Sequence, residues 1–383
     1  MTVSLLIVGA SVRAAAGSAL RAGFGPVGVD LFSDEDLRAM ARSRRVEPGS
    51  YPGGLVRLAE AEPAGPWMYT GALENHPELI DRISAGRPLW GNDGATTRTV
   101  RDPMAMAEVL RSRGLPALEV LLDPAGLPED GSWLIKPLRS AGGMGIRPWL
   151  GIGSEAGGGL PSYYQRRKRG PSGSAVFLAD GRSGVLVGVT RQWIGGGAGP
   201  FGYLGSVGPV GIPGEMREQL ERTGRVLSRA FGLRGLFGID FVSEGGVAWP
   251  TEVNPRYSAS VEVLEWATGR TLLREHAAVF DGAIDRHSSC RVEIPSRRVG
   301  KLIVFARRDG SIPENVRWRL DDLAAGRFPR LADLPAPGSR FRAGQPVLTL
   351  LERGRSAGEC RRRLFRRLLG WRRRLDRWAR GLP

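Results

Sequence analysis

The sequence predicts a protein of mixed α/β and α+β class. A doubly wound parallel sheet comes first, a two-part domain follows, and a small β-rich unit precedes a basic amphipathic helix. Three observations predict this order: strands and helices alternate over roughly the first 95 residues, a glycine-rich loop and a strand hairpin follow, and arginines gather at the carboxyl end. With 383 residues, 42% of them hydrophobic, the chain is long enough for several packed units. The expected boundaries are 1–97, 98–285, 286–352 and 353–383.

The amino-terminal unit opens on an apolar run. Residues 3–9, VSLLIVG, read as a buried parallel strand, and the alanine-rich segment after them reads as a helix. A second strand is expected at 26–32, and Ser33 with Asp36 is expected to form a capping box for the next helix. The segments WMYTGAL and NHPELIDRIS predict another strand and a helix that Pro77 opens. Because no G-x-G-x-x-G follows the first strand, we predict no dinucleotide site.

A glycine-rich loop follows the apolar segment SWLI. Residues 135–146 read IKPLRSAGGMGI, and Lys136 is one of three lysines among 55 basic residues. A lysine kept where arginine is the rule suggests that a compact ammonium group is needed there. The loop is not a Walker A motif, because it lacks G-x-x-x-x-G-K-[ST]. Residues 151–162, GIGSEAGGGLPS, are expected to form a hinge or a lid.

Two carboxylates and an amide are predicted to converge on a later hairpin. Asp240 lies in the strand FGIDFV, the chain reverses at SEGG, and the returning strand VAWPTEVNP carries Glu252 and Asn254. Side chains alternate with a period of two along a strand, so the three can share a face. Acids in such apolar segments are costly to bury unless they are neutralised. Hard oxygen ligands suit Mg²⁺, so the hairpin and the glycine loop together predict a site for a nucleoside triphosphate with its metal.

The combination of IKPLRSAGGMGI, GIDF and TEVNPR resembles the ATP-grasp superfamily over roughly residues 1–280. The resemblance implies ATP with Mg²⁺ or Mn²⁺ as cofactors and Asp240, Glu252 and Asn254 as metal ligands. It implies that Lys136 pairs with the α- and β-phosphates and acts in catalysis with Arg256, which stabilises charge on the transferring group. Arg101 lies where many members carry a first phosphate-binding lysine. The implied cradle for the terminal phosphates is made by main-chain N–H groups near Ser140, Ala141, Gly142, Gly143 and Gly145.

The hinge of the implied nucleotide site departs from the superfamily pattern. Many members carry an acidic residue for the ribose there, whereas this chain has Gln165 followed by the basic run RRKR. Gln165 can accept one hydrogen bond, and main-chain groups of Tyr164 to Arg166 are expected to contact adenine. The basic run itself reads either as a solvated turn or as a site for an anionic substrate.

Within the superfamily, YTGALEN, LWGN, VRDP and TEVNPRYSASVE are similar to a group described as predicted ATP-dependent carboligases, related in fold to biotin carboxylase. This resemblance implies a carboxylate-amine ligase that forms an acyl phosphate and releases ADP, with one-carbon cofactor biosynthesis as one implied setting. Its partners would be a small carboxylate and a small amine. A carboxylase or a carbamoyl-phosphate-type enzyme is the alternative, although PRYSASVEVLE lacks the QVEH pattern of biotin carboxylases. Substrate contacts are expected near residues 70–75 and from Ser172, Ser174, Gln192, Ser258 and Ser260.

The carboxyl-terminal tail holds most of the excess charge. Residues 353–383 contain twelve arginines and two acids, a local +10 of the net +16, which argues against nucleic acid as a partner of the remainder. Leucines, Phe365 and tryptophans at spacings of three and four predict an amphipathic helix. It is expected to dock on the protein, to lie on an anionic membrane or partner, or to contact RNA. A nonenzymatic ATP-binding module recruited through this tail is the rival class.

Cellular location follows from what the sequence lacks. No run reaches the roughly 18 apolar residues of a membrane span, and no basic segment precedes the first apolar stretch. The two cysteines are far apart and show no CxxC spacing. We therefore expect a cytoplasmic protein without a zinc site.

Overall fold

The computed structural model describes residues 2–151, 160–196, 199–282, 295–320 and 326–382. Most of the predicted hinge or lid at 151–162 lies outside these residues. In the described part, no helix is both long enough and apolar enough to cross a bilayer.

The amino-terminal unit is the predicted parallel sheet, with strand order β3-β2-β1-β4. Its strands are β1 (Ser4–Val8), β2 (Gly25–Asp30), β3 (Arg42–Arg45) and β4 (Trp67–Tyr69). Its helices are α1 (Arg13–Arg21), α2 (Glu35–Met40), α3 (Gly53–Glu60) and α4 (Pro77–Ser84), with short 3-10 turns η1 (Pro48–Ser50) and η2 (Leu73–Asn75). The run from Leu5 to Val8 is buried on both faces of the sheet, as its unbroken apolar sequence predicts.

The predicted capping box at the start of α2 is wrong. Asp34 occupies the cap position and makes no side-chain cap bond. The Ser33 hydroxyl instead lies 2.6 Å from that of Ser43, and Asp36 accepts hydrogen bonds from the N–H groups of Asp333 and Leu334, both at 2.9 Å. A contact from far along the chain therefore takes the carboxylate that the local pattern assigned to the helix end.

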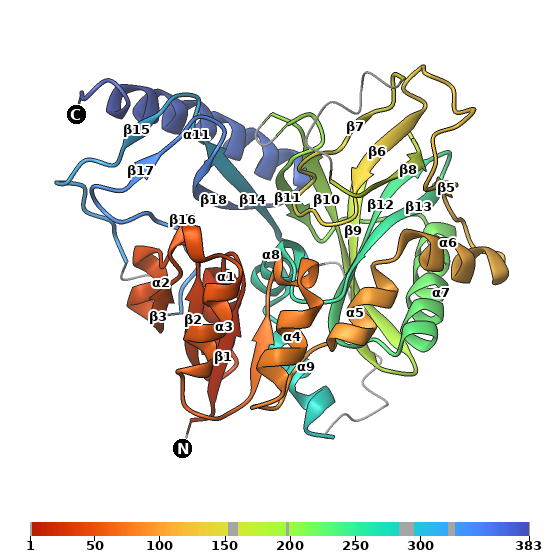
Figure 1. The fold of residues 1–383 in the computed structure, drawn as a ribbon. Helices are drawn as coiled ribbons and strands as arrows, with labels where there is room; N and C mark the ends of the chain where they lie inside the picture. Colours follow the sequence, from red (N-terminus) through yellow and green to blue (C-terminus); the bar gives the residue numbers. More distant parts are fainter. Residues whose placement is uncertain (1, 152–159, 197–198, 283–294, 321–325, 383) are drawn as a thin grey trace.

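A large antiparallel sheet forms the centre of the molecule, in the order β13-β12-β9-β10-β11-β14-β18-β16 (Figure 1). Its strands are β9 (Ser172–Asp180), β10 (Gly184–Ile194), β11 (Tyr203–Gly208), β12 (Arg234–Glu244), β13 (Val247–Asn254), β14 (Arg298–Phe305), β16 (Leu331–Ala332) and β18 (Pro346–Gly354). β9 and β10 form an antiparallel hairpin. The last three strands of this order come from the predicted carboxyl-terminal unit, so one sheet runs across the expected boundary at residue 286.

Two smaller sheets complete the strands. One has the order β5-β8-β6-β7 and is built from β5 (Val120–Leu121), β6 (Trp133–Pro137), β7 (Arg147–Pro148) and β8 (Ser162–Arg166). The other pairs β15 (Gly310–Ser311) with β17 (Arg340–Phe341). The first matters for function, because Lys136 lies on β6 and faces the large sheet.

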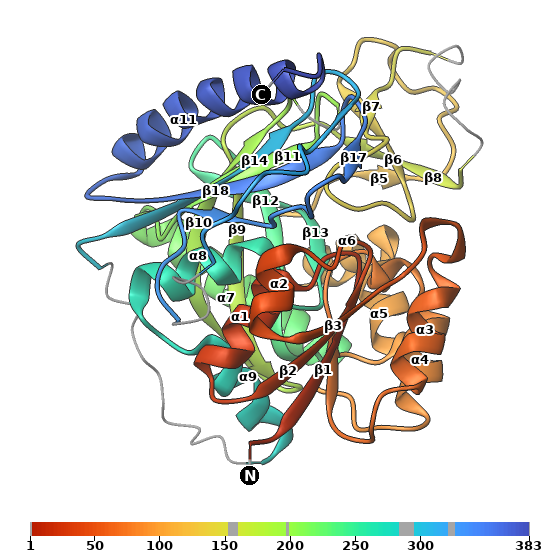
Figure 2. The same ribbon diagram turned by 90° about the vertical axis from the view of Figure 1, so that its left-hand side faces the viewer.

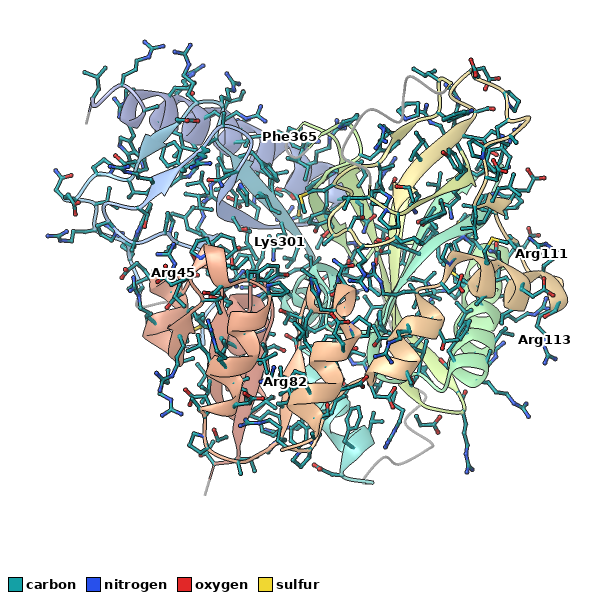
Figure 3. The ribbon with its side chains drawn as sticks, in the orientation of Figure 1. Arg45, Arg82, Arg111, Arg113, Lys301 and Phe365 are labelled. Carbon is teal, nitrogen blue, oxygen red and sulfur yellow. The ribbon has the colours of Figure 1, made fainter. Side chains whose placement is uncertain are left out.

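Helices cover the large sheet and join it to the first unit. They are α5 (Gly94–Val100), α6 (Pro103–Ser112), α7 (Gly214–Phe231), α8 (Ala259–Thr268), α9 (Leu272–Phe280) and α11 (Ala357–Trp378). The helix predicted in the tail is α11, which lies along β14 and β18 (Figure 2). Its apolar stripe, with Leu364, Leu368 and Leu375, is buried in a core shared with these strands, and the Trp193 ring meets Phe365 edge to face (Figure 3). The tail helix therefore docks on the protein.

Candidate active site

The antiparallel register of β12 and β13 brings the predicted metal ligands together. Asp240 lies directly opposite Glu252, and Gly238 lies opposite Asn254. The Asn254 amide donates to Asp240 Oδ2 at 3.3 Å, and Gln192 on β10 donates to Asp240 Oδ1 at 3.2 Å. The spacing predicted this convergence, because the turn at SEGG fixes the register of the hairpin.

The two carboxylates are held close enough to perturb each other. Burial, followed by the charge of Glu252, raises the pKa of Asp240 to about 7. For Glu252, burial is outweighed by the positive charges of Lys136 and Arg101, so its pKa is lowered. A divalent cation between the carboxylates would remove their repulsion, so the donor set fits Mg²⁺. No third His, Cys, Asp or Glu joins them among the described residues, and the remaining ligands would be Asn254, water or phosphate oxygens.

Lys136 faces these carboxylates from the smaller sheet. Only 6% of the residue is exposed, and its ammonium donates to Gln165 Oε1 at 3.2 Å and to the Thr251 carbonyl at 3.1 Å. Burial lowers its pKa, but Tyr163 and Glu252 outweigh that effect and the net pKa is raised. The side chain therefore stays charged, as a phosphate ligand must.

A pocket opens between the two sheets at this lysine. The empty space in it, part of which is open to solvent, is about 430 Å³. Its lining residues are Val100, Arg101, Pro103, Met106, Lys136, Pro137, Leu138, Ser140, Tyr163, Thr251, Glu252 and Val253. A lining that combines apolar side chains with charged groups suits a flat base that carries a polyphosphate.

The glycine loop borders this pocket between β6 and β7. Gly142, Gly143 and Gly145 have positive φ angles of 62°, 79° and 75°, and a Cβ at Gly143 would lie 2.0 Å from the Phe201 carbonyl oxygen. Only glycine fits there. The Tyr203 N–H donates to the Gly142 carbonyl at 2.9 Å, which holds the loop over β11.

The hinge strand β8 carries the main-chain groups of Tyr164 to Arg166 that were expected to contact adenine. β8 is an inner strand, and one of these groups, the N–H of Arg166, donates to the Glu119 carbonyl at 2.9 Å. The Tyr164 ring packs edge to face on Trp149, while Tyr163 shares the face of Lys136 and lines the pocket. Gln165 is buried and serves as the partner of Lys136. Sequence reasoning passed over Tyr163, although alternation along β8 places it on the face of Gln165.

Arg101 and Arg256 both contact Glu74, a residue to which the sequence alone assigned no role. Glu74, within the stretch expected to contact substrate, accepts hydrogen bonds from Arg256 at 2.6 and 3.0 Å and lies 3.5 Å from Arg101. Among the predicted serines, Ser174 hydrogen-bonds Asp240, whereas Ser260 bonds the Thr190 hydroxyl at 2.8 Å. The motif ALEN was the available signal for Glu74, because a glutamate after a buried strand requires a partner.

A lysine-bearing sheet, a glycine loop and a carboxylate hairpin around one pocket define a nucleotide-binding enzyme fold. Residues 101–260 match the family model described as ATP-grasp domain. This stretch therefore matches an ATP-grasp domain, as its motifs predicted.

The curated relatives align with this chain over only a small part of their own length. The carbamoyl phosphate synthase large chain of Beutenbergia cavernae is 25% identical over 239 positions, covering 54% of this chain and 21% of the relative. That of Pasteurella multocida is 30% identical over 105 positions, covering 27% and 10%. The chain therefore spans between a tenth and about a fifth of the length of these relatives.

Solved structures match the chain almost end to end. A biotin carboxylase from Campylobacter jejuni has a TM-score of 0.70 at 15% identity, covering 95% of this chain and 90% of that one. Phosphoribosylamine–glycine ligase from Thermotoga maritima has a TM-score of 0.68 at 18% identity, covering 95% of this chain and 96% of that one. L-Amino acid ligase from Bacillus licheniformis has a TM-score of 0.66 at 16% identity, covering 98% of both chains. At these identities the likeness shows the fold.

Proposed function

We propose that the protein is an ATP- and Mg²⁺-dependent ligase that activates a small carboxylate and joins it to an amine, releasing ADP. The observation that carries the proposal is the meeting of Lys136 and Glu252 in one pocket beside the glycine loop, with Asp240 directly opposite Glu252 on the hairpin. The phosphoribosylamine–glycine ligase and the L-amino acid ligase among the proteins of similar fold support it.

The chain's residues would divide the work by charge. Lys136 binds the α- and β-phosphates, and Arg101 adds a second cation at the rim of the pocket. N–H groups of the glycine loop, at Ser140, Ala141, Gly142, Gly143 and Gly145, point toward the terminal phosphates. Asp240, Glu252 and Asn254 would hold Mg²⁺ or Mn²⁺, which supplies charge neutralisation at the phosphates.

The reaction balances with these groups alone. A carboxylate oxygen attacks the γ-phosphorus, the bond from that phosphorus to the β–γ bridging oxygen breaks, and ADP leaves. The amine nitrogen then attacks the acyl carbon, phosphate departs, and the nitrogen loses a proton. Arg256, beside Asn254 at 3.0 Å, would stabilise the oxygen charge that develops in both steps.

A screen for ADP release tests the proposal. Pairs of small carboxylates and amines are offered with MgATP to the wild-type protein, to Lys136→Ala and to Arg82→Ala, an exposed cation outside the site whose partner is Glu60 at 3.1 Å. We expect amine-dependent ADP release that Lys136→Ala abolishes and Arg82→Ala retains. MgATP binding without ADP release from any pair would instead support the nonenzymatic module.

Bicarbonate as the carboxylate is the second candidate, because the curated relatives are carbamoyl phosphate synthases. The same screen separates it: ADP release that needs bicarbonate, with ammonia or no amine, would assign the chain to the carbamoyl-phosphate or carboxylase type. The cytoplasm, where ATP is abundant, is the proposed location of either activity.

A proposed partner of the tail is an anionic phospholipid surface. The outward face of α11 exposes Arg362, Arg366, Arg373 and Arg377, and these positions recur every three or four residues about Leu369, which is 51% exposed. The aromatic rings of α11 are turned into the core, so base stacking does not favour RNA. Co-sedimentation with anionic but not neutral vesicles, lost in a quadruple Arg→Gln variant, is expected; retention on neutral vesicles or preference for RNA would contradict it.

A further inference from the structure

Glu74, in the amino-terminal unit, contacts Arg101, which lines the pocket. It lies in η2, directly after β4, and follows Ala72, whose φ of 77° turns the chain sharply. Its side chain is only 1% exposed. One oxygen, Oε1, accepts from Nε and Nη2 of Arg256 at 3.0 and 2.6 Å and lies 3.5 Å from Nη1 of Arg101. One carboxylate oxygen thus holds two guanidinium groups from separate segments.

Both arginines continue from this oxygen to the groups that would bind MgATP. Arg256 donates to Asn254 Oδ1 at 3.0 Å, so it touches a proposed metal ligand. Arg101 donates to the carbonyl of Ser140 in the glycine loop at 3.4 Å and to Asn75 Oδ1 at 2.9 Å. A continuous set of contacts therefore runs from the first unit to both sides of the phosphate site.

A second carboxylate in the same unit shows how a purely structural pair differs. Glu62 is also buried and also bridges two arginines, but each oxygen has its own partner, Oε1 with Arg44 and Oε2 with Arg42. Glu74 Oε2 is buried with no hydrogen-bond partner. Leaving a carboxylate oxygen unpaired is unfavourable, and such costs persist where function requires the geometry. Glu62 pairs with arginines on β3, at the opposite edge of the sheet from β4.

We propose that Glu74 is a positioning residue that keeps Arg101 and Arg256 side by side at the phosphate site. Without its charge, the two guanidinium groups would repel each other and Lys136 nearby. Arg101 would then leave the glycine loop, and Arg256 would turn toward Asn254 and Glu252. The inference rests on the proposed function only for turnover, since its effect on MgATP affinity needs no substrate pair.

MgATP titration by calorimetry tests this role in the full chain. Glu74→Gln keeps the side-chain shape and removes the charge, and Glu62→Gln is its matched control. We expect Glu74→Gln to weaken MgATP binding about tenfold or more and Glu62→Gln to change it less than about twofold. In an Arg101→Ala background, Glu74→Gln is expected to have a smaller further effect on affinity, because only the part that passes through Arg256 remains.

The outcomes are separable. Equal loss of affinity in Glu74→Gln with and without Arg101, or equal loss in Glu62→Gln, would overturn the inference, since either result indicates general damage to the unit. If Glu74→Gln does not fold, Glu74→Asp, which retains the charge, still tests it through the same cycle. Wild-type protein that binds MgATP but never releases ADP would refute the ligase proposal and leave this test intact.

Discussion

Two clusters of buried charge in this molecule are built from similar residues and behave in opposite ways. At the junction of α1, α8 and β14, Glu262 pairs with Arg13 and, at 2.6 Å, with Lys301, and Arg13 also meets Asp333 at 2.9 Å; Lys301 lies where β14 reaches the amino-terminal helices (Figure 3). At the pocket, Asp240 lies directly opposite Glu252 on the neighbouring strand. The junction pairs its carboxylates with cations of the chain, whereas the pocket places two carboxylates side by side.

The pKa values express the same contrast. At the junction, burial of Glu262 is outweighed by Arg13 and Lys301, and its pKa falls to about 2. In the pocket, burial and Glu252 raise the pKa of Asp240 to about 7. A carboxylate held ionised by paired cations stabilises the fold, whereas a raised pKa beside a second carboxylate in a pocket marks a candidate metal ligand.

The largest expected effect is on activity. Glu252→Gln should lower ADP release by about 1,000-fold or more, because it removes one proposed metal ligand that faces Lys136. Steady-state kinetics measure the loss, and circular dichroism should show an unchanged fold. Activity within tenfold of the wild type would remove Glu252 from the site.

The corresponding substitution of glutamate by glutamine at the junction should instead destabilise the fold. Glu262→Gln is expected to lower the free energy of unfolding by about 3–5 kcal/mol at pH 7, because it strands Arg13 and Lys301 without their shared anion. Since the folded pKa of Glu262 is depressed to about 2, its contribution is present above the unfolded value and disappears as pH falls through about 2. Urea titration at pH 7 measures the change. A loss below 1 kcal/mol would mean that the junction is not structurally important.

Asp240→Asn should raise the free energy of unfolding of the metal-free protein, whereas Glu262→Gln lowers it. The folded pKa of Asp240 is raised above its unfolded value, so ionising it between about pH 4 and pH 7 destabilises the fold. Removing the charge is therefore expected to stabilise the metal-free protein by about 1–2 kcal/mol at pH 8, while activity is lost. Thermal unfolding in EDTA checks this. Destabilisation at pH 8 would contradict the raised pKa.

The smallest expected effect is on the pH dependence of metal binding. Because a metal needs the ionised form of Asp240, Mn²⁺ affinity should fall by about tenfold for each pH unit below 7 and level off above it. Titration followed by electron paramagnetic resonance measures it. An affinity independent of pH between 5.5 and 8 would place the metal elsewhere.

Local patterns were enough to predict much of this molecule. The period-two alternation and the turn at SEGG predicted the Asp240–Glu252 pair, and the spacing of apolar residues in the tail predicted the helix α11. Tertiary contacts decided the rest. Asp36 looked like a cap residue but accepts hydrogen bonds from a loop about 300 positions later. β14 and β18 belong to the large sheet, which could not be predicted because strand pairing over such distances leaves no local signal in the sequence. Glu74 also could not be assigned, because its partners Arg101 and Arg256 meet it only in the folded chain.

The central claim is that Asp240, Glu252 and Asn254 hold a divalent ion against the phosphates of ATP. Anomalous diffraction from crystals grown with Mn²⁺ and a nonhydrolysable ATP analogue tests it most directly. The account predicts a manganese peak within about 2.3 Å of oxygens from both carboxylates, bridged to phosphate oxygens beneath the glycine loop. A manganese peak away from these carboxylates, or a nucleotide bound with no contact to Lys136, would contradict it.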